Sequence, residues 1–115
     1  MASNEKKTVN FLGDDFMYTA LNLFLQEAGL LTAPDDVKGD FVEKVAIDLV
    51  DFTNKAILSE LKPEQIETAL KISEQGSDYS SKEKAYSELI PNFSEKIQTV
   101  MDLVLRKVRL GLYNN

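Results

Sequence analysis

The chain has 115 residues, of which 43% are hydrophobic and 28% are charged, a composition typical of a globular domain and not of a disordered chain. It contains no cysteine and no histidine, which excludes disulfides, thiolate chemistry and cysteine-based zinc sites, and removes the commonest general base. Its 13 basic and 19 acidic residues give a net charge of -6, which disfavours binding to nucleic acid or to an anionic membrane.

No segment of the sequence predicts a membrane span or a signal peptide. The longest mostly apolar run, residues 16–25, is shorter than the roughly 20 residues that a bilayer-spanning helix requires. The two lysines near the N-terminus are not followed by an apolar stretch. We therefore expect a cytoplasmic protein.

The first predicted element is an N-terminal arm, residues 1–12, which we expect to be loosely ordered. We expect Val9, Phe11 and Leu12, near the end of the arm, to rest against the body. The rest of the chain, residues 13–115, is predicted to form one helical domain.

Apolar residues recur at helical spacing in five segments of this domain. In chain order, the segments are residues 14–28, 36–60, 63–75, 81–90 and 93–110. Gly29 is placed to end the first helix in a left-handed conformation. Two apolar stripes on the second helix indicate a central element with several neighbours.

The later helices begin and end at recognisable residues. Pro63 suits the first turn of the third helix, Ser80 or Ser81 can cap the fourth, and Gly111 ends the fifth. Nothing in the sequence predicts a strand pair. The predicted fold is all-α, a single compact bundle of about five helices.

The junction between the last two helices gives each of its residues a structural role. Pro91 disfavours helical geometry at Ile90 and interrupts the hydrogen-bond ladder. Asn92 and Glu95 have the spacing of a capping box, and Ile90 and Phe93 can pack at the corner. We predict a helix–corner–helix junction at these residues.

These residues also carry a resemblance. The stretch LKPEQIETALKI, followed after a polar gap by YSELIPNFSEKIQ, resembles a family of short bacterial proteins known only as a domain of unknown function. The resemblance covers residues 61–98 and implies a small helical protein. It departs at Lys62, where the family pattern has serine or threonine as a helix cap, and it transfers no catalytic residue.

No residue pattern predicts a catalytic, cofactor-binding or metal site. The Gly13-Asp14-Asp15 stretch is best explained as an acidic helix start. The acidic residues around Gly39 do not have the spacing of a calcium loop. Without histidine, the chain cannot supply the ligands of a di-iron bundle. We expect no enzyme activity and no cofactor.

The C-terminal stretch LRKVRLGLYNN is the one basic and hydrophobic segment of this acidic chain, and it could dock on an acidic partner. The predicted partner-binding residues are Arg106, Arg109, Leu112 and Tyr113. The structural alternative is that the cations complement the helix dipole while Val108 and Leu110 pack in the core.

We therefore expect an adapter or self-associating module without catalysis. Its partner would be another protein or a second copy, because the wide apolar faces of the first two helices exceed what five helices can cover. Two alternatives are an acidic inhibitor or decoy of a nucleic-acid-binding protein, and a binder of a small apolar ligand within the bundle.

Overall fold

The computed structural model describes residues 9–76 and 78–113, and all regular secondary structure within these ranges is α-helical. The five helices are α1 (Asp14–Glu27), α2 (Asp35–Leu58), α3 (Pro63–Glu74), α4 (Tyr79–Leu89) and α5 (Phe93–Arg109). The all-α, five-helix fold predicted from the sequence is therefore confirmed.

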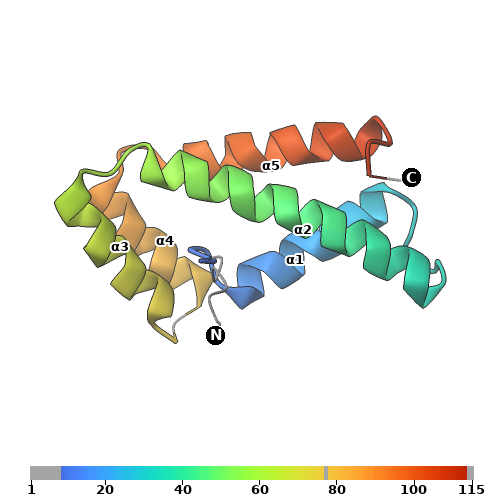
Figure 1. Cartoon of the computed structure of the whole chain (residues 1–115), viewed down its shortest axis with the longest axis horizontal. Coiled ribbons are helices and arrows are strands. Elements are labelled where there is room, and N and C mark those ends of the chain that lie inside the picture. Colours follow the sequence, from blue (N-terminus) through green and yellow to red (C-terminus); the bar gives the residue numbers. More distant parts are fainter. Residues whose placement is uncertain (1–8, 77, 114–115) are drawn as a thin grey trace, which may run out of the picture.

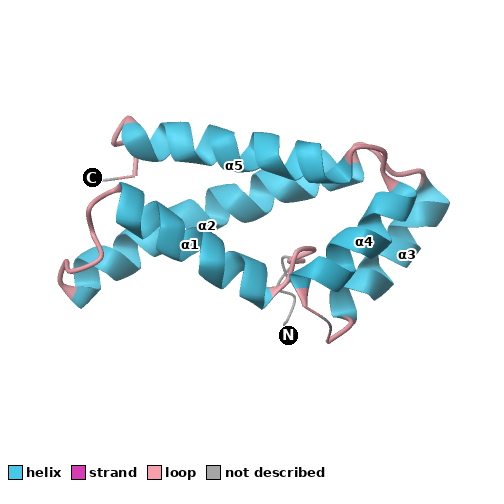
Figure 2. Ribbon diagram, turned by 180° about the vertical axis from the view of Figure 1, so that it is seen from behind, coloured by secondary structure: helices cyan, strands magenta, loops and turns pink. Residues whose placement is uncertain are grey.

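The two longest helices, α2 and α5, lie side by side and run in opposite directions (Figure 1). The third long helix, α1, packs against both of them, and the shorter α3 and α4 form a hairpin at one end of the pair, with α4 against α5 (Figures 1 and 2). The two long helices thus support α1 and α4 directly, and α3 packs on α4.

Buried side chains form two clusters. The three-helix core comprises Ala20, Phe24, Leu25, Phe41, Val45, Leu49, Val100, Val104, Val108 and Tyr113. The hairpin core comprises Phe11, Leu12, Ile57, Ala69, Ile72, Tyr86, Ile90, Phe93 and Ile97. Since α2 and α5 contribute to both clusters, the two cores share a common wall. Each large side chain fully buried there contributes on the order of 2 kcal/mol of transfer free energy.

The end of the N-terminal arm belongs to the hairpin core. Residues 1–8 of the predicted arm lie outside the described residues, but Phe11 and Leu12 are only 2% and 1% exposed. The Tyr86 hydroxyl donates a hydrogen bond to the Phe11 carbonyl, and the Asn54 amide donates one to the Val9 carbonyl at 3.0 Å. Burial also raises the pKa of Tyr86. These contacts fasten residues 9–12 to α2 and α4.

Left-handed glycines end α1 and α5. Gly29 and Gly111 have φ angles of 73° and 74°. The N–H of Leu30 donates to the Leu25 carbonyl at 2.9 Å, and the N–H of Leu112 donates to the Lys107 carbonyl at 3.1 Å. Both are Schellman motifs, which turn the chain back across the last turn of the helix.

Helix α3 begins at Pro63, as predicted, whereas the cap of α4 differs from the prediction. At the start of α3, the Gln65 side chain accepts a hydrogen bond from the Lys62 N–H at 2.9 Å, so half of a capping box forms without serine or threonine. At the start of α4, the cap is Asp78, which accepts from the Ser81 N–H at 3.0 Å. That bond lowers the pKa of Asp78. The prediction of Ser80 or Ser81 as the cap was wrong, and α4 begins two residues earlier.

The junction between α4 and α5 is a packed corner, but the predicted capping box is wrong. Ile90 and Phe93 are each 1% exposed, as expected for corner packing. Asn92, however, has φ 57° and ψ 37°, and no side-chain hydrogen bond caps α5. An N-cap side chain needs an extended backbone at its own residue to reach the first-turn N–H groups. Asn92 is left-handed instead, so Glu95 has no box to complete.

Asn92 is therefore expected to matter through its backbone conformation. Replacing it with alanine should lower the free energy of unfolding by about 1 kcal/mol, because a left-handed conformation is costly for residues with a Cβ. Asn92→Gly should equal or exceed the wild type. Asn92→Ser is the control, because serine is a good cap and a poor left-handed residue. Chemical denaturation in which Ser matched Asn and exceeded Gly would contradict this assignment.

Candidate protein-interaction surface

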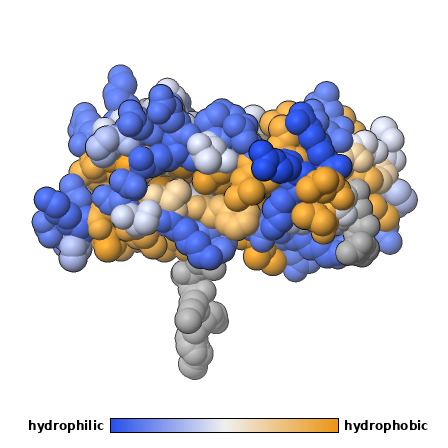
Figure 3. All heavy atoms as spheres, turned by 90° about the horizontal axis from the view of Figure 1, so that it is seen from above, coloured by the Kyte–Doolittle hydropathy of each residue, from blue (hydrophilic) through white to orange (hydrophobic). Residues whose placement is uncertain are grey.

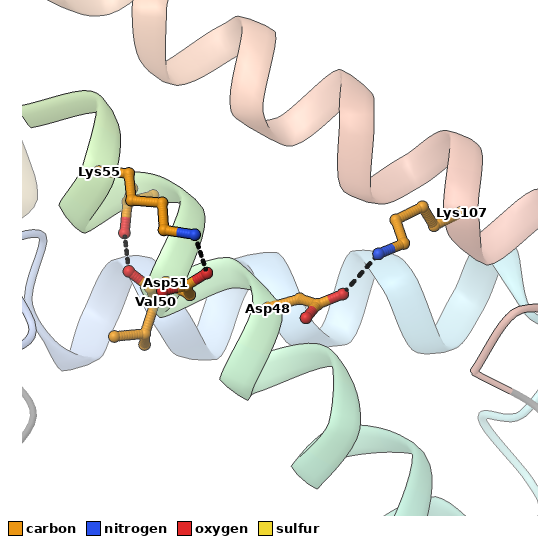
Figure 4. Close-up of polar contacts among 6 residues, drawn as sticks. Asp48, Val50, Asp51, Lys55 and Lys107 are labelled. Atoms are coloured by element: carbon orange, nitrogen blue, oxygen red, sulfur yellow. Dashed lines mark hydrogen bonds and ion pairs between the residues drawn. The ribbon is translucent and has the colours of Figure 1, made fainter.

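The carboxylate of Asp48 connects α2 to α5 and to the residues that follow α5. Its Oδ2 accepts a hydrogen bond from the Lys107 ammonium at 2.8 Å and another from the Tyr113 hydroxyl at 2.6 Å. Figure 4 shows the first of these bonds spanning the two helices, beside the Asp51–Lys55 pair within α2. One oxygen atom thus joins three segments of the chain.

Aromatic rings surround this contact. The Lys107 nitrogen lies 5.2 Å from the centre of the Phe52 ring and 5.6 Å from that of Tyr113. The Phe41 and Tyr113 rings meet edge to face at 6.2 Å. A cation over two ring faces and an edge-to-face pair are both favourable arrangements. They hold the Tyr113 side chain in the three-helix core.

Both acidic members of this contact have altered titration. Partial burial by itself raises the pKa of Asp48, but the hydrogen bonds from Lys107 and Tyr113 and the charge of Lys107 outweigh it, and the net shift is downward. Burial, together with the neighbouring Asp48 carboxylate, raises the pKa of Tyr113. At neutral pH the contact is therefore a carboxylate with two donors.

The four residues predicted to bind a partner do not form one surface. Tyr113 is only 6% exposed, so it is a core residue and not an exposed anchor. Arg109 is paired with Glu27 of α1 at 3.4 Å. Leu112 is 54% exposed at the end of the molecule. Arg106 is exposed and has no ion-pair partner among the described residues.

The structural alternative for the C-terminal segment, in which Val108 and Leu110 both pack in the core, is correct for Val108 only. Val108 is buried, as predicted, but Leu110 is 68% exposed. The Schellman motif at Gly111 brings Tyr113 into the core, where the sequence pattern had placed Leu110. Leu110 is left on the solvent side of α5.

Exposed residues on α5 form a stripe that the sequence reasoning missed. Leu103, Arg106 and Leu110 are separated by three and four positions, which places them on one side of the helix. Leu103 is 43% exposed, and Arg106 stands between the two leucines. The stripe is therefore a cation flanked by two aliphatic side chains.

A stripe of opposite character lies on α2. Ile47 is 63% exposed, and the exposed acids Glu43 and Asp51 precede and follow it by four positions. Asp51 pairs with Lys55 at 3.1 Å, whereas Glu43 has no ion-pair partner among the described residues. A hollow of about 450 Å³ lies along the same part of α2, with Ile47 and Asp51 in its lining.

Both stripes lie on the side of the α2–α5 pair that faces away from α1. Asp48 of α2 and Lys107 of α5 mark where the two helices meet, and the buried residues next to them share the three-helix core with residues of α1. Helical periodicity turns the stripes to the opposite side. We call this surface the outer face, and its residues are Glu43, Ile47, Asp51, Leu103, Arg106 and Leu110.

The space-filling view from above shows that hydrophobic residues also reach the surface outside the two cores (Figure 3). Seen from above, hydrophobic surface forms an interrupted band along the molecule between hydrophilic margins (Figure 3). Apolar surface framed by polar residues is typical of protein-interaction sites. The outer face is therefore the candidate functional site.

A second candidate is a polar cleft of about 570 Å³ where α1 and α4 begin and α3 ends. Lys82 lines it, is only 3% exposed, and donates to the Gln75 carbonyl at 2.7 Å. Asp15 accepts hydrogen bonds from the N–H groups of Phe16 and Tyr79, both at 2.9 Å. These groups satisfy the ends of three helices, so the cleft has a structural explanation.

Lys82 illustrates what a sequence pattern cannot reveal. A lysine near the start of a short polar helix is normally solvent-facing. Here its ammonium replaces water at the carbonyl of Gln75, the residue that follows α3. Asp14 and Asp15 do stand in the first turn of α1, as predicted for an acidic helix start.

The described residues contain neither a metal-ion site nor a membrane-spanning helix. No group of three or more histidine, cysteine, aspartate or glutamate side chains there is placed to hold a metal ion. No helix in the same part of the chain is both long and apolar enough to cross a membrane.

Comparison with known proteins identified no related sequence or structure. No family model matches the sequence, and no significant match was found among curated proteins or solved structures. The resemblance of residues 61–98 to a family of short bacterial proteins therefore stays a prediction.

We predict that the Asp48 contact stabilises the fold in a pH-dependent manner. Asp48→Asn should lower the free energy of unfolding at neutral pH by about 1–2 kcal/mol, because it weakens two hydrogen bonds to a charged group. The pKa of Asp48 is lower in the folded state than the 3.8 of an unperturbed aspartate. The stabilisation is therefore present above that value and is lost as pH falls through the folded-state pKa.

Denaturation of wild type and variant across acidic pH measures this difference. The two proteins should differ most at neutral pH and converge below about pH 4. Asp40→Asn is the matched control, since it removes an exposed pair with Lys44 on the same helix and should cost no more than about 0.5 kcal/mol. A constant difference between wild type and Asp48→Asn at every pH would contradict the role assigned to the carboxylate.

Proposed function

We propose that this chain is a non-catalytic helical module that acts through protein–protein contact at the outer face. The observation that carries the proposal is the combination of exposed aliphatic side chains with a cation, Arg106, that has no ion-pair partner in the part of the chain that the structure describes. Such residues, framed by polar groups, are those that interfaces bury. The Asp48 contact keeps α2 and α5 in register, so the face is preorganised for binding.

Two observations favour this function over a small apolar-ligand binder. The polar cleft has no lining residue from either buried cluster. The hollow on α2 is a surface feature beside Ile47 and does not enter the three-helix core. A binder of an apolar molecule would need a concave, mostly apolar site that encloses its ligand.

The charge distribution also argues against an acidic decoy of a nucleic-acid-binding protein. Such a protein would present a continuous acidic face that imitates a phosphate backbone. Here acids alternate with lysines along α2, as in the Asp40–Lys44 and Asp51–Lys55 pairs. The last turn of α5 carries three cations, Arg106, Lys107 and Arg109.

Site-specific photocrosslinking in the producing cell tests the proposal. A photoreactive residue in place of Leu110 should give a discrete crosslinked species. The same residue in place of Lys84, which is exposed on α4 away from the outer face, should not. Equal crosslinking from both positions, or none from Leu110, would contradict the proposed function. The mass of the product shows whether the partner is a second copy or another protein.

A further inference from the structure

We propose that the partner of the outer face is a second copy of this chain, bound about a two-fold axis so that α5 of each copy lies on α2 of the other. This inference rests on the proposed function and names its partner. It uses residues that the fold exposes; among the described residues Arg106 and Glu43 have no ion-pair partner, and Asp51 pairs with Lys55 within its own helix.

The two stripes of the outer face are complementary in chemistry. On α5 the order is leucine, arginine, leucine at positions 103, 106 and 110; on α2 it is glutamate, isoleucine, aspartate at positions 43, 47 and 51. With Ile47 of one copy between the two leucines of the other, Arg106 lies level with Ile47, and its long side chain can reach an acidic residue about 6 Å away along α2. The aliphatic groups then bury one another, and the charges pair at the rim.

The stripes also match in length. At 1.5 Å per residue, positions 103 to 110 span ~10 Å of α5 and positions 43 to 51 span ~12 Å of α2. The hollow beside Ile47 and Asp51 offers space for an aliphatic side chain, and Leu110, which caps the end of α5, is 68% exposed. Shape and polarity therefore agree along the same stretch.

A two-fold arrangement follows because one molecule carries both stripes on one face. The Asp48–Lys107 pair holds α2 next to α5, so a rotation that places α5 on the partner's α2 also places the partner's α5 on α2. The contact then occurs twice and closes, with no free stripe left to extend a fibre. Four helices would form two packed layers, with α1 of each copy on the outside.

Because each chain has a net charge of -6, the proposed orientation is favoured over other contacts between two copies. Two acidic chains repel each other in most orientations, and the repulsion is lowest where a cation faces an acid. Arg106 is the cation of the outer face without an ion-pair partner among the described residues. This orientation therefore has an electrostatic advantage over other contacts between copies.

Sedimentation of variants in which the charges of one stripe are reversed tests the proposal. The wild type should form a dimer. Arg106→Glu, and separately the double variant Glu43→Lys/Asp51→Lys, should each weaken self-association by about a hundredfold or more, since each brings like charges together. An equal mixture of the two variants should recover dimers that contain one copy of each, because both contacts regain opposite charges.

The design distinguishes specific pairing from an effect of total charge. The double lysine variant is less acidic than the wild type, so a total-charge effect would strengthen its self-association. Lys84→Glu adds the same charge as Arg106→Glu but lies on α4, and it should leave the dimer unchanged. Circular dichroism and melting of each variant confirm that it folds.

Three outcomes overturn the proposal. A wild type that stays monomeric at millimolar concentration excludes the dimer, and so do single-stripe variants that dimerise as well as the wild type. A mixture that fails to recover dimers excludes the α5-on-α2 contact. If the wild type is monomeric while Leu110 still crosslinks to a different protein, the proposed function stands and the second copy is the wrong partner.

Discussion

The packing of α5 on α2 is the constraint on which the rest of this molecule depends. These two helices form the shared wall of both hydrophobic cores, so a shift between them would disturb each core. The Asp48 carboxylate fixes their relative position near one end by accepting from Lys107 and Tyr113 at once. The same contact draws the chain after Gly111 back into the three-helix core. A single oxygen atom therefore holds both the relative position of the two helices and the packing of the segment after Gly111.

The exposed surface follows from that packing. Because Val104 and Val108 face the three-helix core and Lys107 faces Asp48, Leu103, Arg106 and Leu110 are left on the solvent side of α5. On α2 the same geometry leaves out Ile47 and its acidic neighbours. In the proposed interface, these exposed aliphatic side chains are the groups that contact with another protein would remove from water.

The sequence predicts the helices well and their tertiary details poorly. Helical periodicity and the local chemistry of Gly29, Pro63 and Gly111 are short-range properties, and the five predicted segments match the observed helices closely. The predictions of the α4 cap and of the Asn92 conformation were wrong because neighbouring residues were equally suited to those roles by local sequence alone. Burial of Tyr113 and exposure of Leu110 depend on a partner, Asp48, that is 65 positions away in the chain. No local pattern contains that information, and so the outer face was not predicted.

Isotope-filtered NMR of a mixed sample tests the central claim most directly. One half of the molecules would be labelled at isoleucine methyl groups and the other half at leucine methyl groups. Nuclear Overhauser effects between Ile47 of one copy and Leu103 or Leu110 of the other can arise only across an interface. The account predicts these effects at millimolar concentration, together with concentration-dependent shifts on the outer face. Their absence, with shifts independent of concentration, would show that this surface does not bind its own copy.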